Sequence, residues 1–206
     1  NQYYVKKEDD DKNVYLVSSS SIEPFMGTLY DFAESGTFPS VTSATITDVK
    51  VDKENSYELT QDADNLFWNV SDGKTTEKAD TTKAGTVTSA VGSLAYDKFV
   101  DYNCTDDSKY GFDDPYAVIT VKYTEEEQET QTVEKTLTIY VGDETGDDRY
   151  VKVDDSREVY TITKDSLTDI LDSTMSDFYN LTVSYVSSND LDSLEVQSAD
   201  GDHTIN

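Results

Sequence analysis

Two stretches near opposite ends of the chain are almost the same, and this internal echo constrains the fold more than any other feature. The first, YVKKEDDDKNVYLV, begins at Tyr4, and the second, YVKVDDSREVYTI, begins at Tyr150. Each has apolar and aromatic residues on both sides of a charged turn, which is the pattern of a β-hairpin with a solvated tip. Self-similarity at a distance is typical of repeated architecture. The chain is therefore expected to contain the same structural unit more than once.

The echo continues from each hairpin into a following amphipathic segment. SSSSIEPFMGTLYDF matches TKDSLTDILDSTMSDF, and farther on TDVKVDKENSYELT resembles SYVSSNDLDSLEVQ. This order predicts a chain cut out of phase from a repeat: residues 1–42 are the C-terminal part of a first unit, residues 43–180 a complete unit, and residues 181–206 the N-terminal part of a further unit. The helices near 22–33 and 166–177 should then follow hairpins with the same strand directions.

Alternation of apolar and polar residues predicts that β-sheet dominates. YAVITVKYT and KTLTIYVG each place their apolar residues on one side, and the charged EEEQET between them predicts an antiparallel hairpin. Shorter strands are predicted in ATITDVKV, SYELTQ, LFWNV, RYVKV, EVYTI and LTVSYV, which are rich in Thr, Val and Tyr.

Three segments change to helical spacing: SIEPFMGTLYDFAES, DTTKAGTVTSAVGSLAY and DSLTDILDSTMSDF. Ser21 is the expected N-cap of the first, and Asp165 or Ser166 of the third. The predicted fold class is α+β, mainly antiparallel β-sheet with about three short amphipathic helices, built from a duplicated unit.

The charge balance excludes several classes of partner. The chain has 43 acidic and 16 basic residues, a formal net charge of −27. Such a field repels phosphate backbones and anionic headgroups, so neither nucleic acid binding nor direct membrane contact is expected. No apolar run approaches the roughly 20 residues that span a bilayer. If the native protein is exported or anchored, the segments responsible have been removed or lie outside this chain.

Few residues are available for nucleophilic or metal chemistry. Cys104 is the only cysteine and is surrounded by acids, so neither an internal disulfide nor a thiolate cluster is expected. His203 is the only histidine and lies close to the C-terminus, where a triad would depend on a frayed segment. No catalytic residue is predicted. The acidic clusters EDDDKN, TDDSKYGFDD, GDETGDD and SADGDH supply oxygen ligands of the kind calcium prefers, which makes calcium the one cofactor worth considering; otherwise none is expected.

The middle of the chain, which occurs once, carries an ordered set of motifs. A strand ends in a Trp, a helix follows, YGFDDP precedes a strand pair that ends in Val-Gly, and a Tyr-Val … Val-Tyr hairpin closes the set. In this order the motifs resemble the bacterial domain-of-unknown-function family 4340 (DUF4340), with Phe112 and Val141 in place of the usual Leu and Ile. The matching positions are Trp68, Tyr110, Gly111, Asp113, Pro115, Gly142, Tyr150 and Tyr160.

The resemblance implies an extracytoplasmic protein held by a lipid or a single N-terminal helix, and some members accompany ABC transporter components of the gliding-motility type. It assigns no catalytic residues. The lean cysteine content and the acidic, Tyr-rich composition suit a Gram-positive cell-surface version. The residues themselves favour a structural role for YGFDDPY, because Gly111 permits an unusual backbone conformation, Asp113 can bond local backbone, and Pro115 fixes φ before a strand.

Together these observations predict a non-enzymatic extracytoplasmic scaffold or binding module of the cell envelope, with protein partners there and an association with an ABC-transporter-type assembly. Two alternatives stay open. One is a carbohydrate- or peptide-binding surface on which exposed Tyr residues and Trp68 stack. The other is a hydrolase that uses two carboxylates about 5–10 Å apart. The sequence leaves the oligomeric state undetermined.

Overall fold

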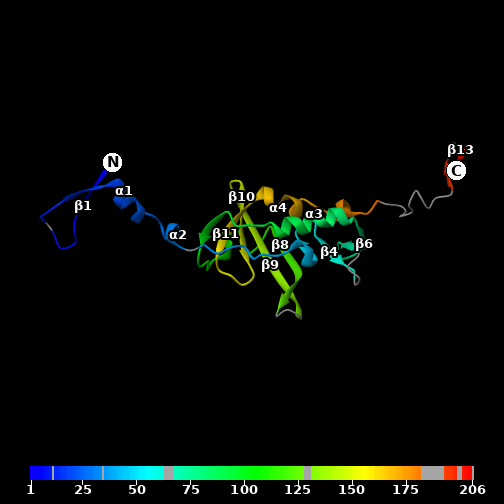
Figure 1. Cartoon of the computed structure of the whole chain (residues 1–206), viewed down its shortest axis with the longest axis horizontal. Coiled ribbons are helices and arrows are strands. Elements are labelled where there is room, and N and C mark those ends of the chain that lie inside the picture. Colours follow the sequence, from blue (N-terminus) through cyan, green and yellow to red (C-terminus); the bar gives the residue numbers. More distant parts are fainter. Residues whose placement is uncertain are drawn as a thin grey trace.

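One nine-stranded sheet forms the centre of the computed structural model (Figure 1). The structure describes residues 1–10, 12–33, 35–62, 67–127, 131–181, 193–198 and 201–205. The strand order is β6-β5-β4-β3-β8-β9-β10-β11-β7, and every neighbouring pair is antiparallel. The strands are β3 (Ile46–Asp52), β4 (Tyr57–Gln61), β5 (Trp68–Ser71), β6 (Thr76–Ala79), β7 (Lys98–Asp101), β8 (Ala117–Glu127), β9 (Gln131–Thr145), β10 (Asp148–Val153) and β11 (Val159–Thr163).

Two separate hairpins lie outside the large sheet. They are β1 (Gln2–Val5) with β2 (Tyr15–Ser18), and β12 (Leu194–Ser198) with β13 (Gly201–Ile205), and they stand at opposite ends of the view in Figure 1. The predicted strand LTVSYV lies, apart from Leu181, outside the described residues.

The predicted central hairpin is confirmed and forms the longest pairing of the sheet. β8 and β9 pair without interruption from Ala117 opposite Val141 to Glu127 opposite Gln131. The apolar residues assigned to one side by alternation are buried, with Ile119 and Ile139 at 0% exposure. The α+β class, with mainly antiparallel strands, is therefore confirmed.

Two helices cover one face of the sheet and contact each other: α3 (Thr81–Gly92) and α4 (Lys164–Leu171). Asp80 caps α3, because its carboxylate accepts from the amides of Thr82 and Lys83 at 2.8 and 3.1 Å. The cap predicted for α4 at Asp165 or Ser166 is wrong. Strand β11 stays paired up to Thr163, and the helix begins at the next residue.

The continuous helix predicted near 22–33 is also wrong in detail. The segment forms α1 (Ser19–Ile22), the 3₁₀ turn η1 (Glu23–Phe25) and α2 (Leu29–Phe32). Pro24 has no amide hydrogen to continue a helix, and Gly27 follows it in the break. Ser18, not Ser21, is the residue before α1.

The hairpin repeat predicted from the sequence is present in the pairing register. In β1–β2, Tyr4 lies opposite Leu16 and Val5 opposite Tyr15. In β10–β11, the equivalent residues Tyr150 and Val151 lie opposite Thr161 and Tyr160. In both copies a helix begins directly after the second strand, and a second short helix follows a break; in the later copy it is η4 (Met175–Phe178). The boundaries 1–42, 43–180 and 181–206 stay a prediction.

The large sheet and its two helices are built from two halves with the same order of elements, which the sequence did not reveal. Four strands and a helix, β3 to β6 and α3, are followed after β7 by four strands and a helix, β8 to β11 and α4. The first strands of the two halves, β3 and β8, pair antiparallel in the middle of the sheet. After α3 the chain adds β7 beside β11, and after α4 Tyr179 forms a bridge with Ala79 of β6. Each half therefore completes the outer edge of the other.

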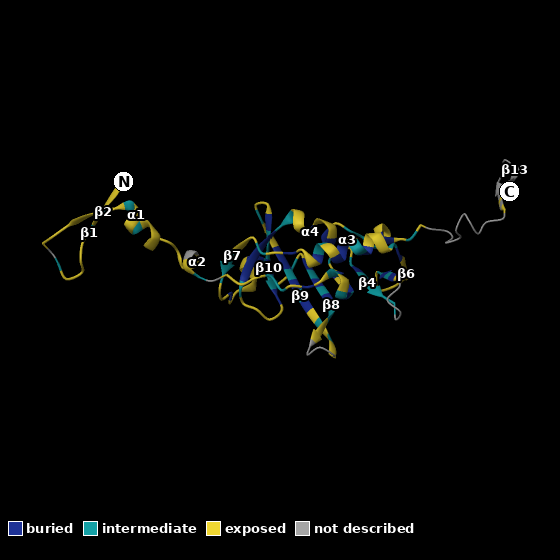
Figure 2. Cartoon of the chain, viewed as in Figure 1, coloured by how far each residue is buried: buried dark blue, intermediate teal, exposed yellow. Residues whose placement is uncertain are grey.

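The main core lies between the sheet and the two helices, where Figure 2 shows buried segments of the strands. Tyr96, Phe99 and Tyr160 form a ring stack at one end, with 3.8 Å between the centroids of Tyr96 and Tyr160. A smaller cluster lies on the opposite face and contains Cys104, Tyr110, Phe112 and Val159. Among the described residues, no helix combines the length and apolar composition that a membrane crossing needs.

Candidate functional site

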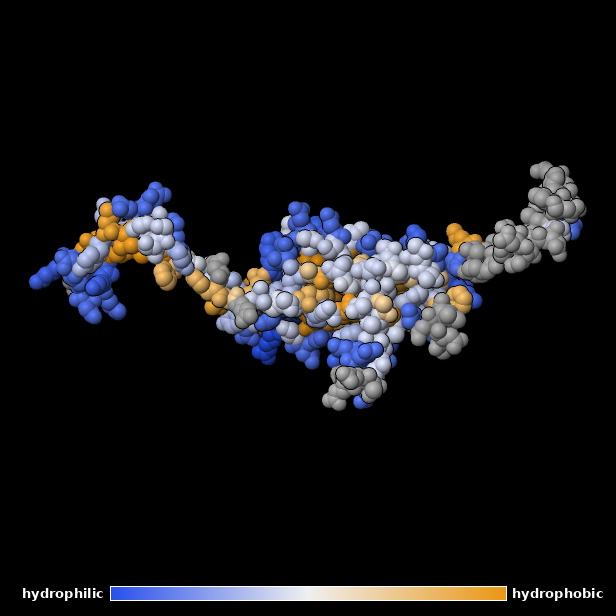
Figure 3. All heavy atoms as spheres, in the orientation of Figure 1, coloured by the Kyte–Doolittle hydropathy of each residue, from blue (hydrophilic) through white to orange (hydrophobic). Residues whose placement is uncertain are grey.

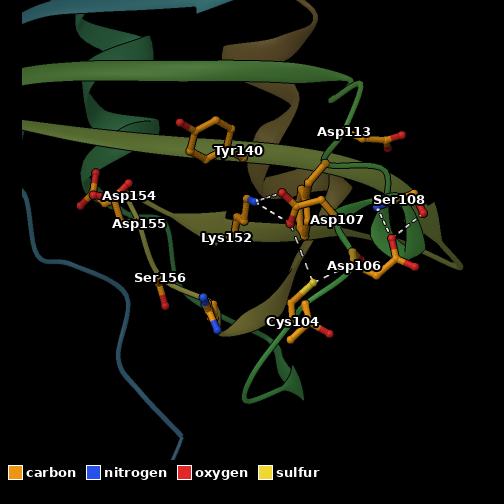
Figure 4. Close-up of a pocket in the computed structure, with 13 residues that line it drawn as sticks. Cys104, Asp106, Asp107, Ser108, Asp113, Tyr140, Lys152, Asp154, Asp155 and Ser156 are labelled. Carbon is orange, nitrogen blue, oxygen red and sulfur yellow. Dashed lines mark hydrogen bonds and ion pairs between the residues drawn. The ribbon is translucent and has the colours of Figure 1, made fainter.

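A polar cavity of about 730 Å³ opens on the face of the sheet opposite to the helices (Figure 4). Its floor is formed by Tyr140 of β9 and Lys152 of β10. Both side chains point away from the main core, because their neighbours Val141 and Val151 point into it. One wall is the segment from Cys104 to Asp113, and the other is the β10–β11 turn from Asp154 to Arg157.

Lys152 is the central charge of this outer-face pocket. Its Nζ lies 2.8 Å from both carboxylate oxygens of Asp107, and its side chain is only 15% exposed. The ammonium lies 5.0 Å from the ring centroid of Phe112 and 5.3 Å from that of Tyr140. These contacts hold Lys152 against two aromatic faces and pair its charge, so the pocket has a neutralised floor.

The wall segment is fixed by backbone bonds to the turn opposite. The amide of Cys104 donates to the carbonyl of Arg157 at 2.8 Å, and its thiol donates to the carbonyl of Asp106 at 3.4 Å. The Asp106 carboxylate accepts hydrogen bonds from the amide and the hydroxyl of Ser108. Asp106 thereby caps the 3₁₀ turn η3 (Asp107–Tyr110). The wall is therefore a built element of the fold.

The turn on the other side contains the one described non-glycine residue with positive φ, Asp154 at 48°. Its amide donates to the carbonyl of Thr138, and its carboxylate accepts from the amide of Thr138, both at 2.8 Å. Asp tolerates this left-handed region because its side chain can bond nearby backbone. The strained turn is thus locked onto β9 beside the pocket.

Four of the sequence-predicted residues meet behind the pocket wall. The rings of Tyr110 and Tyr150 lie 4.9 Å apart, and the Tyr110 hydroxyl donates to Asp101 at 2.9 Å. Gly111 ends η3 with φ of 76°, and a Cβ there would lie 2.6 Å from the Asp143 carboxylate. A Cβ at Gly142 would collide with the carbonyl oxygen of Tyr110. Both glycines are required for close backbone approach.

The other predicted positions lie apart from this corner. Asp113 lines the pocket, and Pro115 stands two residues before β8. Trp68 begins β5 and packs into the main core at 7% exposure, whereas Tyr160 belongs to the ring stack under the helices. The pocket residues that the sequence did not single out are Tyr140 and Lys152, and Asp107 was considered only as part of the acidic cluster TDDSKYGFDD.

The lining residues set what the pocket can do. Asp107, Asp113, Asp154 and Asp155 outnumber Lys152 and Arg157, so the pocket favours cationic or hydroxyl-rich ligands over phosphates. Cys104 is only 8% exposed, and no histidine lines the pocket beside it. The arrangement is therefore suited to binding; it does not present a nucleophile with its base.

Several carboxylates of the acidic clusters proposed as calcium ligands are already bonded within the protein: Asp107 pairs with Lys152, Glu144 with Arg149, and Asp148 with Lys98. Part of the cluster SADGDH lies outside the described residues. Asp10 in the β1–β2 turn accepts from the amides of Lys12 and Asn13, and these bonds, led by the Asn13 side chain, lower its pKa. Within the part of the chain that the structure describes, no group of three His, Cys, Asp or Glu side chains is arranged to hold a metal ion.

The fold and the pocket define a class of protein: an antiparallel α+β module with helices on one face, a polar pocket on the other, and an N-terminal hairpin with the register of β10–β11. The chain belongs to the DUF4340 family, whose description is domain of unknown function; the family model matches residues 1–115 and again residues 68–205. These matches overlap, in agreement with repeated units. Comparisons with curated proteins and with solved structures gave no match.

Proposed function

We propose that this chain is a non-enzymatic scaffold or binding module of an extracytoplasmic cell-envelope protein from a Gram-positive bacterium. In this role it works beside an ABC-transporter-type assembly, through protein partners, and is held at the membrane by a segment outside this chain. The observation that carries the proposal is the repeat: one complete unit is flanked by hairpins, and the first has the pairing register of β10–β11. Repeated units that share one interface type are suited to building extended assemblies.

Charge and cysteine content support an exposed location. A net charge of −27 favours solubility and repels anionic headgroups, and the single thiol of Cys104 is buried, where it is shielded from oxidants. Shaving of intact cells with a protease tests the location. The native protein should be cleaved in this chain under conditions that leave a cytoplasmic marker intact. If both are protected until the cells are lysed, an extracytoplasmic location is refuted.

A carbohydrate or peptide ligand is the second candidate, and the outer-face pocket favours it. Tyr140 offers an aromatic floor next to several carboxylates. Trp68 is buried and does not line the pocket, so Tyr140 is the tyrosine ring on which a ligand in the pocket would stack. Titration of the chain with neutral oligosaccharides and with a Lys-rich peptide should move the NMR signals of the pocket, and Tyr140→Ala should abolish the shift. Identical shifts in the variant would exclude this site.

The hydrolase alternative has no observation in its favour. Among the described residues, the carboxyl whose pKa burial raises is Asp48, which lies on β3 beside Lys122, outside the outer-face pocket. A paired-carboxylate enzyme needs two acids with perturbed environments in one cleft.

A further inference from the structure

The N-terminal docking module, defined as β1, β2, α1, η1 and α2, exposes side chains that its repeat copy buries. Leu171 and Ile170 in α4 are 4% and 0% exposed, and Phe178 in η4 is 2% exposed. Their equivalents in the module, Met26, Phe25 and Phe32, are 61%, 81% and 61% exposed. The aligned positions after the shared hairpin are therefore covered in one copy and open in the other, although the helix is continuous only in the later copy.

The exposure is concentrated, as the hydrophobic spheres at the N-terminal end of Figure 3 show. Ten of the 15 large apolar residues exposed in the described chain belong to the first 33 residues: Tyr3, Tyr4, Val14, Tyr15, Leu16, Phe25, Met26, Leu29, Tyr30 and Phe32. Tyr30 already packs edge-on against Phe99 of β7, with 5.6 Å between the ring centroids. Single exposed apolar residues need no explanation, but a group as large as the rest marks an interaction surface.

The strand edges of the docking module are open in the same way. β10 pairs with β9 on one side and β11 pairs with β7 on the other, so neither has a free edge. β1 and β2 pair only with each other within the described residues. Neither strand contains a charged residue, although the chain carries a net charge of −27. An uncharged open strand is a site for β-augmentation.

The repeat also shows what covers such a module. We propose that the N-terminal docking module binds the open sheet of a further DUF4340 unit that lacks its own closing hairpin and helix, with a β9-type strand of that unit pairing antiparallel to β1. Transfer of the β9–β10 register places Val5 opposite the position of Val141 and Tyr3 opposite that of Glu144. The apolar face of α1 and η1 then covers the partner's core as α4 does here.

This inference goes beyond the proposed scaffold role, because it names the partner and does not depend on where the protein is located. A second intact copy of the chain is a poorer occupant. Its β9 is already paired on both sides, and the two copies would bring two charges of −27 together. Self-association of the intact chain is therefore not expected.

The test pairs the full chain with a fragment of residues 35–147, which contains β3 to β9 and ends before β10. Co-expressed with differently tagged full chain, the fragment should co-purify in equal amounts. F25D/M26D in the full chain should reduce the recovery at least tenfold, and the matched variant Y102D/L181D, at exposed sites elsewhere, should not. Equal recovery with a chain of residues 35–206, which lacks the module, would overturn the proposal in favour of exchange of β10–β11.

A chimera decides the case in which the fragment is insoluble. Residues 148–178 and 2–32 are both 31 residues long, so the first can be replaced by a copy of the second inside the full chain. Amides of β9 should then exchange with solvent at least tenfold more slowly than in the same chimera carrying F25D/M26D in the inserted copy. Equal exchange in the two chimeras would mean that a DUF4340 sheet cannot seat this module, and the proposal would be wrong.

Discussion

Removal of one hydroxyl at the C-terminal end of α4 should have a measurable and local cost. The Tyr57 hydroxyl donates to the carbonyl of Ile170 at 2.8 Å, and Tyr57 is 1% exposed. In a continuing helix this carbonyl would receive the amide of Thr174, but that amide donates to the Asp177 carboxylate at 2.8 Å. Burial also raises the pKa of Tyr57, so the hydroxyl keeps its proton throughout the neutral range. In Tyr57→Phe the carbonyl loses this donor inside the core.

The expected loss follows from the burial of that carbonyl. A buried acceptor left without its partner costs about 1–2 kcal/mol of unfolding free energy. With a urea m-value of about 2 kcal/mol/M, the midpoint should fall by roughly 0.5–1 M while m stays unchanged. Tyr102→Phe is the matched control, since Tyr102 is 55% exposed. A midpoint for Tyr57→Phe within about 0.1 M of that control would refute the reasoning.

The loss should also be confined to one end of the unit. Lys53, four residues before Tyr57, donates to the carbonyls of Leu171 and Ser173, so the β3–β4 hairpin caps the end of α4 with two side chains. Amide exchange in Tyr57→Phe should accelerate in the last turn of α4 and stay unchanged in α3. Acceleration of equal size in both helices would mean a global effect and not the loss of a cap.

Three further outcomes are expected. Gly142→Ala should lower the unfolding free energy by about 1–3 kcal/mol or more, because the new Cβ would collide with the Tyr110 carbonyl. Gly85→Ala is the matched control: a Cβ there meets open space in α3, so the same urea titration should show a gain of up to about 1 kcal/mol. Asp48→Asn should be more stable than the parent at pH 7, since burial raises the pKa of Asp48 and the charged form is the costly one. The gap in unfolding free energy should close as the pH falls below about 4, where both states of the parent are protonated. Cys104, which is 8% exposed, should react with a thiol reagent only at the rate of local or global opening, and labelling as fast as in urea would contradict the packed wall of the pocket.

The sequence predicts the elements whose two faces differ strongly. β8 and β9 alternate over many residues, and their pairing follows from the charged turn between them. Edge strands carry no such pattern: β6 reads TEKA and β7 reads KFVD, and neither was predicted. Their strand state comes from the neighbours β5 and β11, which supply the ladder. Tertiary context determines these two elements.

The pocket was beyond sequence reasoning for a similar reason. Lys152 and Asp107 are separated by 45 positions in the sequence. They meet only because the fold places η3 beside β10. The alternation that buries Val141 and Val151 does place Tyr140 and Lys152 on the opposite face, so half of the floor could have been found. The wall could not, because a turn such as YGFDDP fixes local geometry but not the strand on which it lies.

The internal pairing of the two halves explains why β10, β11 and α4 form a transferable piece. A cut after β7 would separate β7 from β11 and Tyr179 from β6, so each half would lose an edge contact that the other supplies. A cut before β10 breaks the β9 ladder, and the piece that follows it is a continuous hairpin and helix whose other contacts are the β7 ladder and α3. Because that piece keeps the β10–β11 hydrogen bonds, it can stay locally ordered while its apolar face is not covered by a sheet. The N-terminal docking module, with the same hairpin register and an open face, is the form that such a piece takes before it is covered.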